Sequence, residues 1–262
     1  FVRNFAVTAP LLCSAWAQTP YELVSEIRFQ ASSGLKLGEH WKLSDKNGTH
    51  LEGIIDPEYN PRNYSCNEQT GCIKAKPRPY WRPWPEYMHP LIKIMNTSGV
   101  LIFDRMLSWW SRCIGISPYF TEAVILTIDN NRIVKIEGGA EAEALKKFLE
   151  VMTGYLGEGV YDFNAMHFGV HPQAKIAEHQ CPNILHRRLI EHCHTSNFHF
   201  HIGTPQATEA YPYWMHCTAD IRSATLRVGE KLISEEGYLM ALSSPEVRAV
   251  AAKYPDRPGL DQ

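Results

Sequence analysis

The sequence predicts an α+β fold, in which short antiparallel strands pack together with a few helices. Apolar pairs flank the dipeptide Asn47-Gly48, and apolar, β-branched runs flank Asp129-Asn130-Asn131. Both turn sequences suit the left-handed backbone conformations of tight hairpins. Residues 140–153 instead carry apolar side chains at steps of three and four, which indicates an amphipathic helix. Hairpins and helices in one chain are typical of a mixed domain.

The first predicted element is a helix near the N-terminus. Thr19 has the character of a helix N-cap, and Pro20 follows at the first helical position. Residues 21–31 then carry apolar side chains at helical spacing. Gly34 is expected to end this helix.

Two strands and a long loop are expected next. Residues 38–56 form a predicted hairpin around the Asn-Gly turn. Residues 57–90 hold many of the prolines together with Trp81 and Trp84. Because proline lacks the backbone donor that helices and central strands need, this segment is expected to be an aromatic-rich loop.

The remaining elements are strands and helices that complete the domain. Apolar and β-branched runs predict strands over 99–105 and 123–136, before the helix at 140–153. Further strands are expected near 198–202, 216–228 and 231–233, and a last helix from about Ser244.

Composition restricts the classes of partner and compartment. The formal net charge is -2 and no long Lys/Arg run is present, so nothing indicates binding to nucleic acid or to an anionic membrane surface. No apolar run reaches the roughly 18 residues of a membrane-spanning helix. The seven cysteines are an odd number without C-x-x-C spacing, which favours free thiols in the cytoplasm over a disulfide framework.

Histidines are concentrated in one region of the chain. Nine of the twelve fall between residues 167 and 216: His167, His171, His179, His186, His192, His194, His199, His201 and His216. Four of these lie among polar and basic neighbours and are expected to be solvated surface residues without a metal role. They are His179, His186, His192 and His194.

The segment Asn-Phe-His-Phe-His-Ile-Gly at 197–203 has a different character. In a strand, His199 and His201 would point to one face, and the two phenylalanines to the other. Imidazole is the commonest protein donor to iron, zinc and copper, so a paired histidine face favours a metal site over a purely structural pair.

Five segments carry a family resemblance: 47–51, 133–143, 166–174, 197–203 and 215–237. Together they resemble the 2,5-dihydroxypyridine dioxygenases, relatives of the thermophilic metallo-aminopeptidases. The larger architecture of these relatives is an N-terminal α/β domain followed by a metal-bearing α+β domain. The resemblance implies that this chain covers mainly the second of these domains.

The resemblance also implies a division of the chain. Residues 1–37 are expected to be a helical lead-in, the tail of an N-terminal domain that is mostly absent from this chain. Residues 38–262 are expected to be the metal-binding catalytic domain. The chain begins at Phe1 rather than at methionine, which fits a fragment or a processed product.

The family resemblance implies an iron(II) site with two histidines and one carboxylate, and His167 and His216 match the two histidines. The position of the aspartate in the family's His-x-Asp pattern is held by Thr218, and the nearest acid is Asp220. A ligand four strand positions from His216 lies about 13 Å away along the strand. The third ligand is therefore open between His199 and Asp220, and a three-histidine site is favoured.

The resemblance implies an Fe(II)-dependent dioxygenase that opens a hydroxylated aromatic or N-heteroaromatic ring with O2. Candidate acids or bases are His50, His201 and Glu86. Candidates to stack on a flat substrate are Trp81, Trp84 and Trp214, for which core packing is the alternative. The relatives form homo-oligomers, so the same is expected here.

Two other functions are weighed against the dioxygenase. A metallo-aminopeptidase needs two metals bridged by carboxylates. Where those peptidases place carboxylates, this chain has His167 and Thr218. The other alternative is a degenerate, non-catalytic family member that binds a ligand or a partner.

Overall fold

The structure is a computed structural model. It describes residues 8–33, 35–58, 64–66, 73–75, 91–203 and 215–260. Among these, no helix combines the length and the apolar character needed to cross a membrane.

Three helices open the chain: α1 (Ala9–Leu12), α2 (Ala15–Gln18) and α3 (Tyr21–Ser32). The predicted helix is confirmed as α3, but its N-cap is Pro20 rather than Thr19. The Thr19 hydroxyl instead donates to the carbonyl of Ala15, 2.8 Å away, at the end of α2. Apolar side chains of α3, including Ile27, lie in the same core as the sheet. The division of the chain at residue 37 stays a prediction.

The first predicted hairpin is confirmed as β1 (His40–Ser44) and β2 (His50–Ile55). Asp45 holds its turn, because Oδ1 accepts hydrogen bonds from the amides of Asn47 (2.8 Å) and Thr49 (3.0 Å). Gly48 takes a φ of 103°, as the Asn-Gly turn requires.

The region 57–90 differs from the single loop that proline content predicts. It contains a short antiparallel pair, β3 (Tyr64–Cys66) and β4 (Ile73–Ala75). Three-residue strands fit between prolines, because so few ladder bonds are needed. Most of this region, with Trp81, Trp84 and Glu86, lies outside the described residues.

The longest strand is β5 (Leu91–Arg105), followed by α4 (Ser108–Ile114), β6 (Tyr119–Asp129) and β7 (Arg132–Glu137). The second predicted hairpin is confirmed, with Asn130 and Asn131 at φ values of 45° and 65°. Next come α5 (Ala140–Leu156), which confirms the predicted helix, the 3-10 turn η1 (Glu158–Tyr161) and β8 (Phe163–Phe168).

The C-terminal part contains α6 (Ile184–Glu191), β9 (Asn197–Ile202), β10 (Cys217–Arg222), β11 (Thr225–Val228), β12 (Lys231–Glu235), β13 (Tyr238–Leu239), η2 (Met240–Ser243) and α7 (Pro245–Ala251). The strand predicted over 216–228 is in fact two strands. Ser223 takes a φ of 60° between them, which breaks the extended backbone. The predicted helix from Ser244 is confirmed, with Ser244 as its N-cap.

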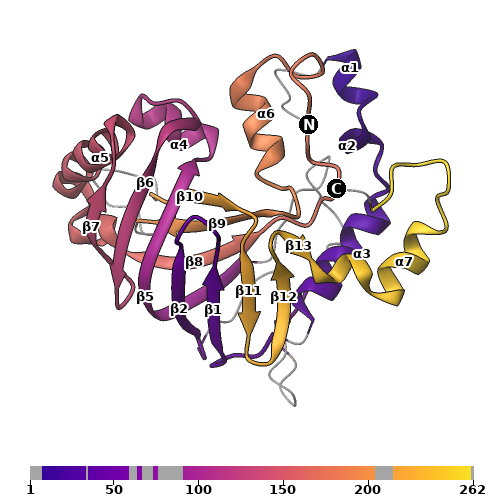
Figure 1. Cartoon of the computed structure of the whole chain (residues 1–262), viewed down its shortest axis with the longest axis horizontal. Coiled ribbons are helices and arrows are strands. Elements are labelled where there is room, and N and C mark those ends of the chain that lie inside the picture. Colours follow the sequence, from indigo (N-terminus) through magenta and orange to yellow (C-terminus); the bar gives the residue numbers. More distant parts are fainter. Residues whose placement is uncertain are drawn as a thin grey trace.

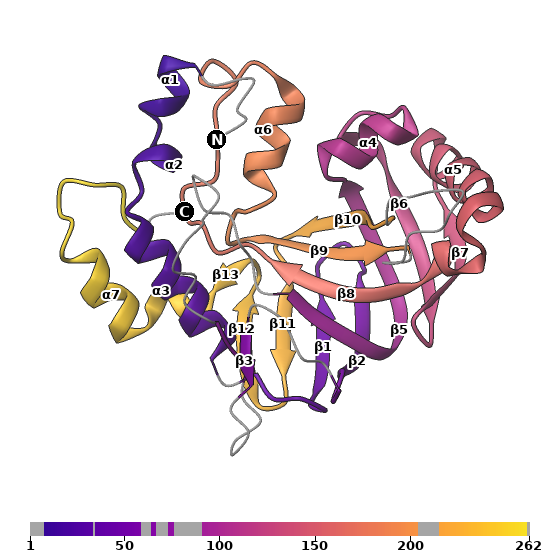
Figure 2. The same ribbon diagram turned by 180° about the vertical axis from the view of Figure 1, so that it is seen from behind.

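Apart from β3 and β4, the described strands form one 11-stranded sheet in the order β10-β9-β8-β5-β2-β1-β11-β12-β13, and β6 joins β5 to β7. Because Asp220 of β10 also pairs with Arg105 of β5, the strands β5, β8, β9 and β10 close a ring. Figure 1 shows β1, β2, β11 and β12 side by side below, and β5 to β7 with α5 to one side. In Figure 2, β8, β9 and β10 lie one above the other beneath α6.

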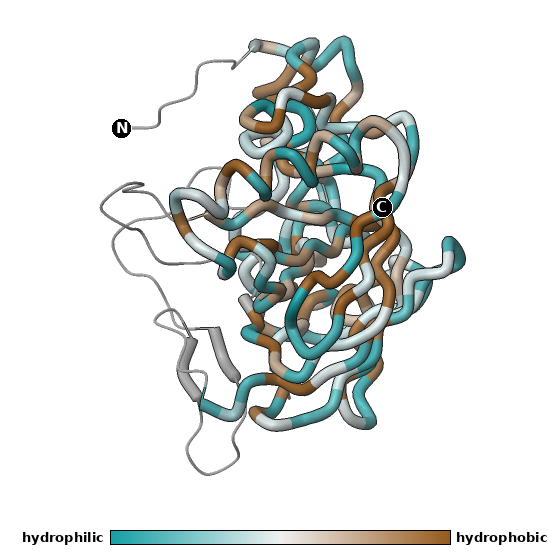
Figure 3. The backbone as a smooth tube through the Cα atoms, turned by 90° about the vertical axis from the view of Figure 1, so that its left-hand side faces the viewer, coloured by the Kyte–Doolittle hydropathy of each residue, from teal (hydrophilic) through white to brown (hydrophobic). Residues whose placement is uncertain are grey.

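Two apolar clusters hold these elements together. The main core joins side chains of α3, the sheet, α5 and α7. A smaller cluster, which includes Trp16 and Ile190, joins the N-terminal helices to α6. Hydrophobic and hydrophilic residues alternate along much of the backbone in Figure 3, as expected for strands with one buried face. The predicted α+β class is confirmed.

Gly99 lies where β5 and β2 approach closely. It takes a φ of 131°, and a Cβ there would lie 2.1 Å from the carbonyl oxygen of His50. We expect Gly99→Ala to lower the free energy of unfolding by about 1–3 kcal/mol, through strain and displacement of the β2 backbone. Urea unfolding of the two proteins measures this difference.

The matched control is Gly154, which is exposed in α5 and has nothing within 4 Å of an added Cβ. Gly154→Ala should raise the free energy of unfolding by about 0.5–1 kcal/mol, because alanine is the better helix former. Equal effects of the two substitutions would contradict the strain assigned to Gly99.

Candidate metal centre

The pairing of β8, β9 and β10 arranges polar side chains in rows on one face of the sheet. His167 lies opposite His199, which lies opposite Asp220. In the next row, His201 lies opposite Thr218. Directly opposed residues of antiparallel strands point to the same face, so the register gathers these side chains.

The other face of β9 is apolar, as the alternation predicts. Phe198 and Phe200 are fully buried, and Phe200 stacks on Phe163 with ring centroids 4.9 Å apart. The prediction that His199 and His201 share one face is confirmed.

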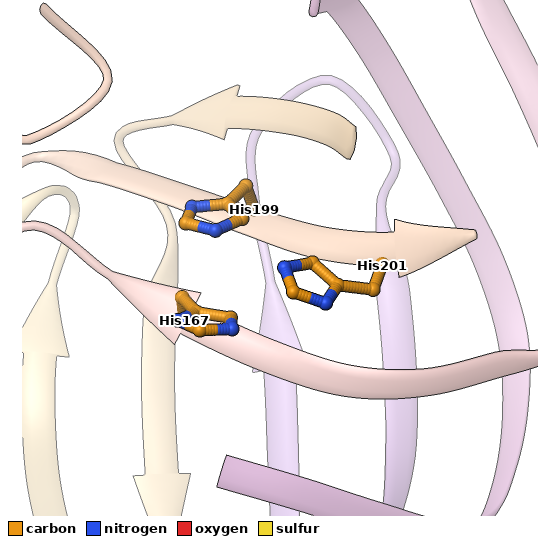
Figure 4. Close-up of side chains that lie close together, drawn as sticks. All are labelled: His167, His199 and His201. Atoms are coloured by element: carbon orange, nitrogen blue, oxygen red, sulfur yellow. The ribbon is translucent and has the colours of Figure 1, made fainter. Parts of the chain in front are cut away.

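Three imidazoles form the first donor group. His167 lies 4.5 Å from both His199 and His201 between ring centroids, with interplanar angles of 12° and 28°. One nitrogen of each ring lies within 4.8 Å of the others. Figure 4 shows the rings from β8 and β9 gathered between the two strands. Three neutral nitrogen donors at this spacing suit iron, zinc or copper.

A second group contains His192, His199 and Asp220, again with one possible ligand atom of each within 4.8 Å of the others. His192 is the C-cap of α6, and its ring centroid lies 3.9 Å from that of His199. The expectation that His192 and His194 are solvated is wrong, because they are only 4% and 0% exposed. His192 caps the C-terminus of α6, and His194 lies in the turn that follows it.

Asp220 is completely buried and its carboxylate is already engaged. Oδ2 accepts hydrogen bonds from Nη2 of Arg188, from Nδ1 of His192 at 2.6 Å and from Nδ2 of Asn197 at 3.3 Å. Burial by itself raises the pKa of the Asp220 carboxyl, but attraction to His192 and Arg188 outweighs burial and holds the pKa well below its usual value. Asp220 is therefore ionised, and Arg188 balances its charge.

His216 lies next to the first donor group and outside both groups. Its ring centroid is 5.0 Å from that of His201 and 5.5 Å from that of Trp110, which meets it edge-on. Burial, with a smaller contribution from the neighbouring His192, lowers the pKa of His216 to about 4, so its imidazole is neutral at pH 7. His201 thus contacts both His167 and His216, the two histidines that the resemblance predicts as metal ligands.

Thr218 stands where the sequence resemblance predicts an aspartate. Its side chain shares the face of His201, and its hydroxyl accepts a hydrogen bond from the backbone amide of Leu107 at 2.8 Å. This hydroxyl anchors the start of α4, and it offers no negative charge to a cation.

The other sequence candidates are placed elsewhere or lie outside the described residues. His50 is exposed at the β1–β2 turn, where its Nδ1 lies 3.1 Å from the carbonyl oxygen of Gly48. The structure does not bring His50 to the histidine groups. Glu86, Trp81, Trp84 and Trp214 fall in undescribed segments.

Sequence reasoning missed the residues around Asp220. Arg188 and His192 lie four positions apart in the chain, so they share one face of α6. The four-residue spacing could have predicted that the two side chains lie together. Their polar neighbours in the sequence instead indicated a solvent-exposed segment. Nothing in the sequence around Trp110 predicted its contact with His216.

Comparison with known proteins gives one family and two solved structures. A family model described as 2,5-dihydroxypyridine 5,6-dioxygenase matches residues 25–241. The structure of 2,5-dihydroxypyridine dioxygenase from Pseudomonas putida KT2440 superimposes with a TM-score of 0.60 at 17% identity, over 89% of this chain and 64% of that chain. Wild-type AmpT from Thermus thermophilus superimposes with a TM-score of 0.44 at 10% identity, over 78% of this chain and 50% of that chain.

The likeness to the Pseudomonas structure concerns the fold, and this chain spans about 64% of its length. No curated protein matches this chain.

Two further buried histidines have a structural role. Nδ1 of His171 accepts a hydrogen bond from the amide of Gln173 (3.2 Å), and Nδ1 of His194 accepts one from the amide of Ser196 (3.1 Å). Both rings must therefore be neutral. Burial lowers the pKa of His171 to about 4, and burial with repulsion from Lys175 lowers the pKa of His194 to about 3.

These two histidines should make the fold sensitive to acid. Their folded pKa values lie below the unfolded value of about 6.5, so the unfolded chain binds more protons between pH 6.5 and 4. Their contribution to stability is present above pH 6.5 and is lost as the pH falls through this window, by up to about 1.4 kcal/mol per pH unit for each histidine. Urea unfolding at a series of pH values gives the free energy of unfolding as a function of pH. Between pH 6.5 and 4, this free energy should change less steeply with pH in His171→Gln than in the unchanged chain.

Glutamine fits this comparison because its amide oxygen can still accept from the Gln173 amide. The control is His179→Gln, since His179 is exposed. If the free energy of unfolding depends on pH identically in His171→Gln and the unchanged chain, the fold does not hold His171 neutral.

Proposed function

We propose that this chain, which belongs to the 2,5-dihydroxypyridine 5,6-dioxygenase family, opens a hydroxylated aromatic or N-heteroaromatic ring with O2 at a mononuclear Fe(II) centre. The observation that carries the proposal is the group of three imidazoles from His167, His199 and His201. The group lies within the segment that the family model matches.

The proposed ligands follow from the chemistry of the donors. Three neutral imidazoles suit Fe(II), and when bound the metal would hold a hydroxylated substrate and O2 side by side. Asp220 is not proposed as a ligand, because Arg188 already neutralises its carboxylate. His201 is proposed as the third ligand in place of His216, because His201 belongs to the three-imidazole group and His216 lies outside it. With Thr218 in place of the aspartate, the site carries one negative charge fewer than the family pattern implies, and an ionised substrate hydroxyl would offset that charge.

The exposure of the imidazoles indicates the side from which substrate arrives. His167 and His199 are 6% and 1% exposed, whereas His201 and His216 are partly exposed. We propose that the ring enters beside His216. A neutral His216 can accept a hydrogen bond from a ring hydroxyl, and Trp110 holds its imidazole in place from the edge.

The donor groups support a mononuclear oxygenase over an aminopeptidase. A dinuclear peptidase site needs carboxylates that bridge two metals. In the described part of the chain, the two groups contain one carboxylate, that of Asp220. Its ion pair with Arg188 leaves it poorly suited to bridging.

Compartment and assembly are further parts of the proposal. Five cysteines in the described residues are free: Cys13, Cys113, Cys181, Cys193 and Cys217. Free thiols are typical of reducing compartments, which supports a cytoplasmic location. The proposed partners are a small aromatic substrate and O2, and the proposed assembly is a homo-oligomer.

Iron content tests the ligand set. The purified chain, reconstituted with Fe(II) without oxygen, should retain about one iron per chain, and His167→Ala and His199→Ala should each lose it. His179→Ala is the exposed control and should keep the iron. Full iron retention in both ligand variants would overturn the proposed centre.

Oxygen uptake in the presence of dihydroxypyridines or catechol-like compounds tests the reaction itself. Iron binding without uptake for any of these compounds would favour the non-catalytic alternative. Two zinc or cobalt ions per chain would favour the peptidase.

Position 218 tests the charge of the site. Both Asp and Asn can accept the hydrogen bond from the Leu107 amide, so Thr218→Asp and Thr218→Asn are nearly isosteric and differ chiefly in charge. Thr218→Asp should bind Fe(II) at least about tenfold more tightly than Thr218→Asn, which corresponds to about 1.4 kcal/mol. Chelator competition measures both affinities, and equal values would mean that residue 218 does not face the metal.

A further inference from the structure

A buried polar cluster lies beside the proposed metal ligands, and we name it the Asp220 cluster. It consists of Asp220 of β10, Asn197 of β9, and Arg188 and His192 at the end of α6. All four residues are at most 4% exposed. Burying a charged pair is costly unless its hydrogen bonds are satisfied, so such a cluster needs a reason.

The cluster holds His192 at two points. Nδ1 of its ring donates to Oδ2 of Asp220 at 2.6 Å, and its backbone carbonyl accepts from Nδ2 of Asn197 at 3.1 Å. The same Asn197 side chain also donates to Asp220. Asp220 thus contacts the His192 ring directly, and Asn197 links the same carboxylate to the His192 backbone.

The His192 ring in turn lies against a proposed ligand. Its centroid is 3.9 Å from that of His199, at an interplanar angle of 36°. His199 also stacks on His167, with ring centroids 4.5 Å apart. The His199 ring thus contacts two imidazoles, one of which is hydrogen-bonded to Asp220.

Arg188 decides between two roles for the carboxylate. A free Asp220 with His192 and His199 would offer a metal two histidines and one carboxylate. The guanidinium of Arg188 pairs with Oδ2, and a metal cation at that oxygen would lie beside a fixed positive charge. The ion pair therefore favours an orienting role for Asp220 over a ligand role.

We propose that Asp220 is a positioning residue: it orients His192, whose ring holds His199 in the geometry that the metal requires. This inference rests on the proposed function, because it takes His199 as a metal ligand. It explains why an acid two residues beyond Thr218, on the same face of β10, does not replace the family's aspartate. Outer partners that orient ligating histidines typically contribute 10–100-fold in metal affinity.

The first test needs no metal. Nitrogen-detected NMR of the metal-free chain reports which ring nitrogen of His192 carries the proton. We expect the Nδ1–H form in the unchanged chain, a changed signal in Asp220→Asn, and altered His199 ring signals in His192→Gln. A His192 ring protonated only at Nε2 would overturn the proposal whatever the metal measurements give.

The second test is the affinity of the purified chain for Co(II), measured by its visible spectrum in competition with a chelator. His192→Gln leaves the Arg188–Asp220 ion pair intact and should lower the affinity about 10–100-fold. Asp220→Asn should lower it by a similar factor, and the double variant should lose little more than either single one, because both act through the same ring.

Arg188→Gln separates the two roles of Asp220 by the sign of its effect. A positioning carboxylate predicts weaker Co(II) binding, because the cluster is loosened. A ligand carboxylate predicts tighter binding, because the competing guanidinium is gone, and this result would overturn the proposal. Unchanged affinity in both Asp220→Asn and His192→Gln would overturn it as well.

The matched control is Asp56→Asn, which alters another buried carboxylate, 3% exposed and paired with Lys93 at 2.9 Å. It should leave Co(II) affinity unchanged, and variants are compared after urea unfolding has shown that they are folded. If the unchanged chain binds neither Co(II) nor Fe(II), the proposed function fails, and the NMR result still decides whether Asp220 orients His192.

Discussion

The antiparallel register of β8, β9 and β10 is the constraint on which the histidine groups depend. His167, His199 and Asp220 belong to segments far apart in the chain, and only the pairing of these three strands places them in one row. Because strand side chains alternate, a slip of one residue on β9 would send His199 and His201 into the apolar core. The fully buried Phe198 and Phe200 oppose such a slip, so core packing and site geometry are maintained by the same contacts.

The electrostatics of the site follow from that arrangement. The sheet gathers imidazoles, which are neutral donors, while the single carboxylate of the two groups is balanced by Arg188 of α6. The positive charge of a bound divalent cation would thus be left largely unneutralised by the protein ligands. The closed ring of β5, β8, β9 and β10 also joins the site to the long strand β5, because Asp220 pairs with Arg105. The strand that carries Asp220 is therefore paired directly with the longest strand of the sheet.

Much of the fold could be predicted from local sequence. The turns at Asn47-Gly48 and Asn130-Asn131, the amphipathic helix α5 and the two-faced strand β9 are all where the sequence predicts them. The family resemblance of segments such as 166–174 is confirmed by the family model over 25–241. The break at Ser223 and the pair β3–β4 were missed, because neither has a strong local signal and both depend on neighbouring strands.

The sequence by itself determined which residue types are present and which side of each strand they face, since periodicity is a local property of the backbone. It therefore indicated a histidine face on the strand that carries His199 and His201. Only the tertiary structure decided which histidines meet. His201 came between His167 and His216, and His192, expected at the surface, was packed onto His199 by α6. The physical reason is that strand register and helix docking are set by long-range packing, which no local pattern encodes.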